Sequence, residues 1–215
     1  MPTLRVRVWD GVTRATHWSL VGLFAFSWWT AEQHEMEYHR YSGYLLLGVL
    51  MLRIFWGIAG STTARFAYFV KGPEAVWHYM RAGRREGEVG HNPLGALSVL
   101  AMLALLVAQV GLGLFSVDID GLESGPLSDW VDFDTGRLCA KLHHRVFSVL
   151  QLIIVIHLLA VAYHVFIKRD GLIRPMITGW KSVAATPREA LRFAPPWRAV
   201  LGVALAATAV WFIVR

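Results

Sequence analysis

Four histidines lie in, or at the ends of, long apolar segments of this chain, where ionisable side chains are unusual. They are His17, His39, His143 and His157. Ionisable residues inside a membrane-spanning segment are costly and are usually functional. A neutral imidazole carries no charge and is a common metal ligand. These four side chains are therefore the first candidates for metal-binding chemistry.

The spacing of the four histidines predicts two pairs at two depths. His143 and His157 are 14 residues apart, which is about 21 Å along a helix and just under four turns, so both rings leave the same face. His39 matches the outer depth of His143, and His17 matches the inner depth of His157. Because two imidazoles can hold one haem iron axially, we predict two b-type haems stacked across a membrane.

The neighbouring histidines leave two of these assignments open. A single histidine in such a segment more often forms a hydrogen bond between helices. The matched depths of the four histidines make this alternative less favoured here. His144 is the alternative to His143, although it lies off the helix face that His143 shares with His157. His34 is the alternative to His39, although its acidic loop favours contact with solvent.

His164 follows His157 by seven residues and lies on the same side of the helix. It is a candidate to contact a haem propionate, relay protons or line a quinone pocket, and a structural role is equally open. His78 and His91 are expected to be residues of a connection between helices.

Five apolar segments are expected to form the helices that position these side chains. Their expected ranges are 16–31, 41–59, 93–115, 142–167 and 199–214. A bilayer crossing needs about 20 mostly apolar residues. The last segment is short, and lying on the membrane surface is its alternative. The connection before the third segment contains PEAVWHYM, from Pro73, which we expect to form a short interfacial helix.

Composition supports a membrane protein. Hydrophobic residues make up 55% of the 215 residues and charged residues only 17%, whereas a soluble domain has about a quarter of its residues charged. The single cysteine, Cys139, excludes an intrachain disulfide framework and a cysteine-ligated cluster within this chain.

The charges alternate between the two sides of the predicted bundle. Basic residues gather in 5–14, 65–85 and 168–198, and acidic residues in 32–37 and 118–134. The positive-inside rule therefore predicts a cytoplasmic amino terminus. The first apolar run is not followed by a small-residue cleavage site, so we expect this first span to be retained. Topology accounts for the net charge of +6, so we expect no nucleic-acid partner.

Several different short motifs are spread along residues 5–180. They are VWD at 8–10, TRATHW at 13–18, HRYSGY at 39–44, RIFWG at 53–57, ARF at 64–66, GHNPLG at 90–95, GPL at 125–127 and KRDGLIRPMITG at 168–179, together with the fourth apolar segment. Together they resemble the bacterial cytochrome b561 family and the related b-type cytochrome subunits of nickel–iron hydrogenases.

The resemblance implies an all-α integral membrane four-helix bundle that holds two haems b, with a fifth, carboxy-terminal transmembrane helix added here. It places the iron ligands on His17, His39, His143 and His157, the same four that the spacing selects. The expected organisation is a di-haem domain at 1–180, followed by a cytoplasmic linker and the added helix at 181–215.

The same resemblance implies electron transfer in the bacterial inner membrane. The expected partners are the lipid bilayer, a quinone (ubiquinone or menaquinone) and a periplasmic c-type cytochrome, hydrogenase or dehydrogenase. The acidic outer loop at 118–134 would dock a basic partner by charge complementarity, and its alternative is a merely solvated loop. Arg14 and Arg53 are candidates to pair with haem propionates, and a snorkelling interfacial arginine is the alternative for Arg53.

Three other functions are open at this point. The chain could anchor a periplasmic hydrogenase-like enzyme without activity of its own, or act directly on a small oxidant or reductant such as superoxide. It could also be a histidine-lined transporter, which predicts no haem spectrum.

Overall fold

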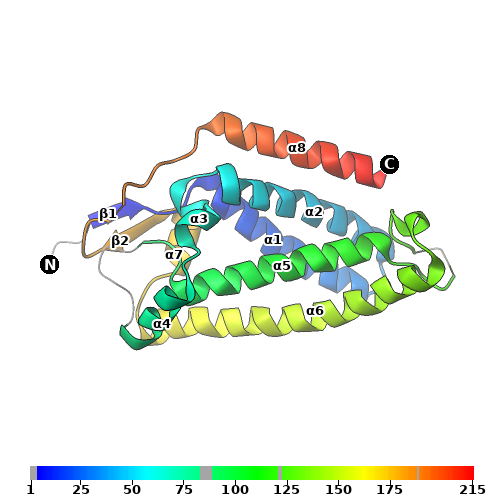
Figure 1. Ribbon diagram of the computed structural model, residues 1–215, viewed down its shortest axis with the longest axis horizontal. Helices are drawn as coiled ribbons and strands as arrows, with labels where there is room; N and C mark the ends of the chain where they lie inside the picture. The colour runs from blue at the N-terminus through cyan, green and yellow to red at the C-terminus, as the bar shows by residue number, and fades with distance from the viewer. Residues whose placement is uncertain (1–3, 83–88, 121–122, 188) are drawn as a thin grey trace. The chain divides into compact units, whose positions relative to one another are not determined.

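Five long helices dominate the computed structural model, which describes residues 4–82, 89–120, 123–187 and 189–215. They are α1 (Gly11–Glu32), α2 (Met36–Ala59), α5 (Pro93–Phe115), α6 (Phe133–Ala162) and α8 (Pro196–Val214) (Figure 1). A π-helical turn, η3 (Tyr163–Ile167), continues α6. Each of the five expected segments is therefore helical, and the predicted all-α membrane fold is confirmed.

Four helices in the described part of the chain are long and apolar enough to cross a membrane. They are Met36–Ala59, Pro93–Phe115, Phe133–Ile167 and Pro196–Val214. The carboxy-terminal segment, for which a surface position was the alternative, is among them. Although α1 has 22 residues, it is not in this set because polar and amphipathic side chains such as His17 and Trp18 lower its hydropathy.

Shorter elements connect the long helices. They are the 3-10 turns η1 (Thr62–Ala64) and η2 (Ser128–Trp130), the helices α3 (Phe66–Phe69), α4 (Pro73–Ala82) and α7 (Ile173–Thr178), and the strands β1 (Leu4–Arg7) and β2 (Trp180–Val183). The expected short helix from Pro73 is α4, and none of its residues is buried. The antiparallel pair β1–β2, in which Leu4 faces Val183 and Arg7 faces Trp180, was not anticipated from the sequence.

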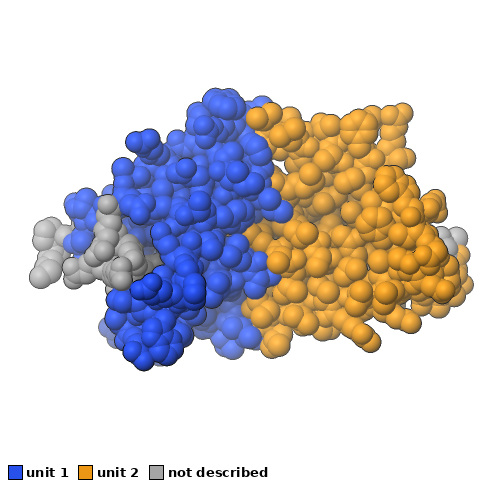
Figure 2. All heavy atoms as spheres, viewed as in Figure 1, with its two compact units in different colours: residues 1–15, 53–101, 155–200 blue, residues 16–52, 102–154, 201–215 orange. Residues whose placement is uncertain are grey.

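The chain forms two compact units, each of which contains part of every long helix. Unit 1 contains residues 1–15, 53–101 and 155–200, and unit 2 contains residues 16–52, 102–154 and 201–215 (Figure 2). Each unit is made of three separate stretches of the chain, whereas the predicted domains are consecutive and divide at residue 180. That division stays a prediction.

Unit 1 is organised around the start of α1. Val8 and Trp9 pack with Val89 in a small buried cluster. Asp10 is 6% exposed and accepts the Thr13 backbone N–H at 2.6 Å, so it caps α1 in the manner favoured for aspartate. Its other carboxylate oxygen accepts the Trp56 indole N–H at 2.9 Å, which ties the start of α1 to α2.

In unit 2, side-chain contacts join four helices. The rings of Phe24 on α1 and Phe147 on α6 lie 5.8 Å apart. Gly48 on α2 faces α8, where a Cβ at Gly48 would lie 3.5 Å from a methyl carbon of Val210. Small residues permit this kind of close approach between membrane helices. The same unit contains three of the four candidate ligands.

Candidate functional site

The rings of His39 and His143 face one another within unit 2. Their centroids are 6.2 Å apart and their planes are nearly perpendicular, at 84°. His39 lies in the first turn of α2, and His143 lies on α6. The structure thus brings together the two side chains that the sequence paired at one depth.

Each of these imidazoles is oriented by a backbone carbonyl of a neighbouring helix. His39 donates from Nδ1 to the carbonyl oxygen of Ser27 on α1 at 2.8 Å. His143 donates from Nδ1 to the carbonyl oxygen of Gln109 on α5 at 2.8 Å. A neutral imidazole that donates from one nitrogen accepts at the other, so both Nε2 atoms are available as ligands. Such hydrogen bonds are the usual support of metal-ligating histidines.

The separation of the two rings suits one metal ion. Metal–imidazole bonds are about 2 Å long, and adding the distance from each nitrogen to its ring centre gives roughly 6 Å between the centroids. Among the described residues, no group of three or more histidine, cysteine or acidic side chains could hold a metal. The pair therefore fits an iron whose other ligands come from a porphyrin, as in b-type cytochromes.

Glycines leave space on the helices around this pair. Gly43 follows His39 by one helical turn and so lies on the same face of α2. A Cβ built on Gly43 or on Gly22 of α1 would meet no atom within 4 Å. By contrast, Gly113 on α5 lies directly against the His143 ring. These positions could accommodate a flat macrocycle close to the backbone.

Of the two adjacent histidines on α6, it is His143 that faces His39. The His143 side chain is half-buried, whereas His144 is exposed. The structure gives His144 a ring contact with His143 at 6.3 Å. His34, the alternative to His39, is exposed with a positive φ of 58° in the turn between α1 and α2.

His17 and His157, the second predicted pair, belong to different units. His17 is a half-buried residue of α1 in unit 2, and its ring lies edge-on to Trp18 at 5.0 Å. His157 is a half-buried residue of α6 in unit 1. Because α6 is helical without a break from Phe133 to Ala162, His157 leaves the same face as His143. The pairing of His17 with His157 stays a prediction.

Arg53 is buried in unit 1, with only 6% of its surface exposed. One guanidinium nitrogen donates to the carbonyl oxygen of Ala64 over a long 3.5 Å, and the guanidinium carbon lies 5.4 Å from the centre of the Phe66 ring. A guanidinium carries five N–H donors, so this environment leaves capacity for an anionic ligand.

Arg14 and His164 also lie in unit 1. Arg14 donates to the carbonyl oxygens of Asp10 at 3.3 Å and Ile177 at 2.5 Å, which ties α1 to α7. His164 is half-buried in the π-helical turn η3, a type of irregularity that is frequent at functional sites. The propionate and quinone roles proposed for these residues stay predictions.

Two further histidines occupy the expected connection. His78 is exposed on α4. His91 lies between two aromatic rings, 4.8 Å from Trp9 and 4.7 Å from Phe69, and therefore contributes to the packing of unit 1.

Sequence reasoning missed the residues that support the His39–His143 pair. Ser27 and Gln109 act through backbone carbonyls, which every residue type has, so their identities carried no signal. Gly113 was equally unmarked, because an apolar helix contains many small residues.

Among the described residues of the predicted acidic docking loop, Asp132 has a structural role. Asp132 precedes α6 and accepts the Thr135 backbone N–H at 2.9 Å and the Thr135 hydroxyl at 2.7 Å. The Thr135 hydroxyl is the main reason that the pKa of Asp132 is lowered from its ordinary value.

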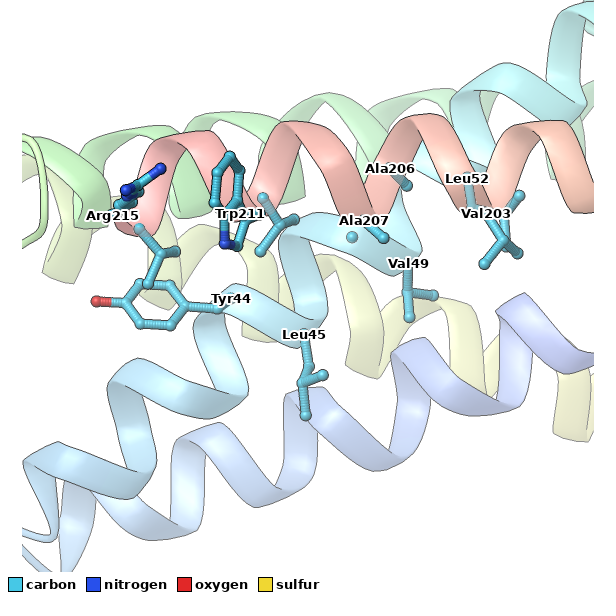
Figure 3. A pocket seen from close by; sticks show the side chains of 12 residues that line it. Tyr44, Leu45, Val49, Leu52, Val203, Ala206, Ala207, Trp211 and Arg215 are labelled. Carbon is cyan, nitrogen blue, oxygen red and sulfur yellow. The ribbon is translucent and has the colours of Figure 1, made fainter.

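An apolar groove of about 780 Å³ lies between α2 and α8 of unit 2 (Figure 3). Tyr44, Trp211 and Arg215 lie at one end, and Leu52 and Val203 lie at the other. Aromatic and basic side chains at the end of an apolar surface are typical of a helix at the lipid–water interface. None of the predicted ligands lines this groove.

Comparison with known proteins gives a family match over most of the chain. A family model described as prokaryotic cytochrome b561 matches residues 8–179. This range includes all four candidate ligands and ends before α8.

Three curated relatives are similar to the chain. They are probable Ni/Fe-hydrogenase B-type cytochrome subunits from Azotobacter chroococcum mcd 1 (25% identical over 159 residues), Azotobacter vinelandii (23% over 159 residues) and Rhizobium leguminosarum bv. viciae (25% over 158 residues). The chain spans 66% of the length of each relative, and each match covers 66% of this chain. No solved structure gives a significant match.

Proposed function

Because the chain belongs to the prokaryotic cytochrome b561 family, we propose that it is a di-haem b electron-transfer protein of the bacterial inner membrane. The resemblance inferred from its motifs is confirmed. The observation that carries the functional proposal is the opposed pair His39–His143, with centroids 6.2 Å apart. Haem b, when bound, supplies reversible one-electron chemistry.

His39 and His143 hold one haem iron through their Nε2 atoms. The carbonyls of Ser27 and Gln109 keep both rings in the tautomer that ligation needs. A neutral ligand ring carries no charge into the membrane, so the cost of burying an ionised side chain is avoided. This reading explains why histidines interrupt such apolar helices.

His17 and His157 hold the second haem iron. The support for this pair is the spacing of 14 residues between His143 and His157 on one unbroken helix, together with the four-histidine pattern of the family resemblance. His143 and His157 lie about 21 Å apart along α6, so haems held at these two positions would give electrons a route across most of the bilayer within one chain.

The amino terminus is cytoplasmic, and His39 and His143 lie near the periplasmic surface. The alternation of basic and acidic connections supports this orientation. Arg53 and Arg14 pair with haem propionates, and the assignment of Arg53 is supported by its burial with a single long hydrogen bond among the described residues. His164 contributes to the quinone site at the cytoplasmic end of α6.

The electrons pass between a periplasmic redox partner and membrane quinone, either ubiquinone or menaquinone. A hydrogenase-like enzyme is one class of partner, supported by the names of the relatives. A c-type cytochrome is the other, supported by the acidic loops on the same side as His39.

A second candidate function is a membrane anchor for a periplasmic hydrogenase, without independent activity. The relatives are named as subunits, which favours this candidate. Copurification of a nickel–iron enzyme from native membranes would support it. Reduction of quinone by the isolated, chemically reduced chain would exclude it.

The central experiment is a reduced-minus-oxidised spectrum with haem quantification on the purified full-length chain. We expect two haems per wild-type chain and one in each of His39→Ala and His157→Ala. A chain without haem after expression with adequate haem supply would contradict the proposal and favour a histidine-lined transporter.

A further inference from the structure

Thr30 lies next to the hydrogen bond that orients His39. Its side chain is completely buried, at 0% exposure. The hydroxyl lies 3.0 Å from the carbonyl oxygen of Ser27 and 3.0 Å from that of Phe26, and it donates toward both. The Ser27 carbonyl oxygen therefore receives hydrogen bonds from Thr30 and from the His39 ring.

The two ligands of the proposed iron thus have unequal supports. The His143 N–H reaches the Gln109 carbonyl, and no second side-chain donor to this oxygen is found among the described residues. The His39 N–H shares the Ser27 carbonyl with a threonine hydroxyl. Both carbonyls also accept the helical backbone N–H of the residue four positions on. Thr30 is therefore an additional donor to the Ser27 oxygen, which has two lone pairs, and an additional donor reduces the electron density available to the His39 N–H.

We propose that Thr30 is a positioning residue that weakens the Nδ1 hydrogen bond of His39 and thereby raises the reduction potential of the haem held by His39 and His143. This inference rests on the proposed function. The hydrogen bond at Nδ1 sets the basicity of a ligating imidazole, and a more basic ligand favours the oxidised iron. Second-shell hydrogen bonding is one of the levers on haem potential.

The Ser27 hydroxyl has a smaller part in the same arrangement. Its oxygen lies 3.2 Å from His39 Nδ1, compared with 2.8 Å for the carbonyl oxygen. Replacing Ser27 by alanine removes the hydroxyl and keeps the carbonyl, so Ser27→Ala measures the contribution of this hydroxyl separately from that of Thr30.

The test is a potentiometric titration of the haem spectrum in the full-length holoprotein, with Thr30→Val and Thr30→Ser compared with wild type. Valine has nearly the same shape and lacks the hydroxyl. We expect Thr30→Val to lower one of the two midpoint potentials, the one whose haem is absent from His39→Ala. We expect Thr30→Ser, which keeps the hydroxyl, to retain the wild-type potential.

Several outcomes would overturn the inference. They are an unchanged or raised potential in Thr30→Val, an equal shift in Thr30→Ser, or a shift confined to the other haem. If Thr30→Val does not assemble with haem, Thr30→Ala provides the same comparison. A full haem content with an unchanged potential would reject the role of Thr30 alone, whereas absence of haem from the wild-type chain would reject the proposed function itself. Electron paramagnetic resonance of the oxidised protein supplies an independent readout of the His39 ligand field.

Discussion

Gly113 on α5 lies directly against the ring of His143 on α6. A Cβ at this position would come within 3.1 Å of the Cε1 atom and 3.3 Å of the Nδ1 atom of His143. We therefore expect Gly113→Ala to displace the ring and lengthen its hydrogen bond to Gln109. The expected result is weaker retention of one of the two haems, measured as haem per chain after purification.

The matched control for this substitution is Gly111→Ala, two residues before Gly113 on α5. A Cβ on Gly111 meets no protein atom within 4 Å. If Gly111→Ala lowers haem content while Gly113→Ala leaves it unchanged, the contact between α5 and His143 is not what limits the site.

The choice between the two adjacent histidines of α6 gives a second prediction. His143→Ala should lose one of the two haems, because the His143 ring faces His39. His144→Ala should retain both haems, since its side chain is exposed. Absorbance of the reduced protein and haem quantification check both variants. Loss of haem in His144→Ala with retention in His143→Ala would reverse the assignment.

The buried carboxylate of Asp10 gives a third prediction, for stability. Asp10→Ala removes both the cap on Thr13 and the acceptor of the Trp56 indole. Loss of a helix cap costs typically about 1 kcal/mol, and leaving a buried donor unsatisfied costs a further 1–3 kcal/mol, roughly. We expect a clearly lower unfolding temperature in detergent, followed by circular dichroism.

Trp56→Phe is the comparison for Asp10→Ala. It removes the indole donor and leaves the bond from Thr13 to Asp10 in place. We expect a smaller loss of stability than in Asp10→Ala. A larger loss in Trp56→Phe than in Asp10→Ala would contradict this expectation.

The pKa of Asp132 gives a fourth prediction, on pH dependence. The Thr135 hydroxyl lowers the pKa of this carboxyl, so the ionised form stabilises the folded state. This contribution is present above the ordinary aspartate pKa, about 3.9, and is lost as pH falls through the lowered folded-state value. Asp132→Asn carries no charge at any pH. Its difference in unfolding temperature from wild type should be constant above about pH 5 and shrink below the ordinary pKa.

Thr135→Val provides the control for this pH dependence, because it removes the hydroxyl donor to Asp132. The low-pH loss of stability should then be smaller and should end at a higher pH than in the wild-type chain, because the folded-state pKa moves back toward the ordinary value. An identical pH profile in the two proteins would show that the Thr135 hydroxyl does not set the pKa of Asp132.

The sequence by itself determined the helical membrane class and the family. Long apolar runs must satisfy their backbone hydrogen bonds internally, so they form helices in a bilayer, and the expected range 93–115 agrees with α5 at both ends. The four histidines could be chosen from nine because helical periodicity places residues 14 apart on one face. The short motifs, which lie in the range matched by the family model, indicated the family.

The helix ends and the small sheet were harder to predict from the sequence. The helix α6 begins at Phe133, nine residues before the expected start. Its first turns are polar and follow the Asp132 cap, so a search for apolar segments did not include them. The pairing of β1 with β2 joins residues 4–7 to residues 180–183, and no local pattern in either segment specifies such a distant partner.

Only the tertiary structure decided how the His39–His143 pair is supported. The acceptors are the carbonyls of Ser27 and Gln109, and Thr30 acts on one of them. Every residue carries a carbonyl group, so its sequence identity cannot reveal which one faces an imidazole. That selection depends on how α1, α2, α5 and α6 pack, and the packing is set by side-chain shapes along their whole contact surfaces.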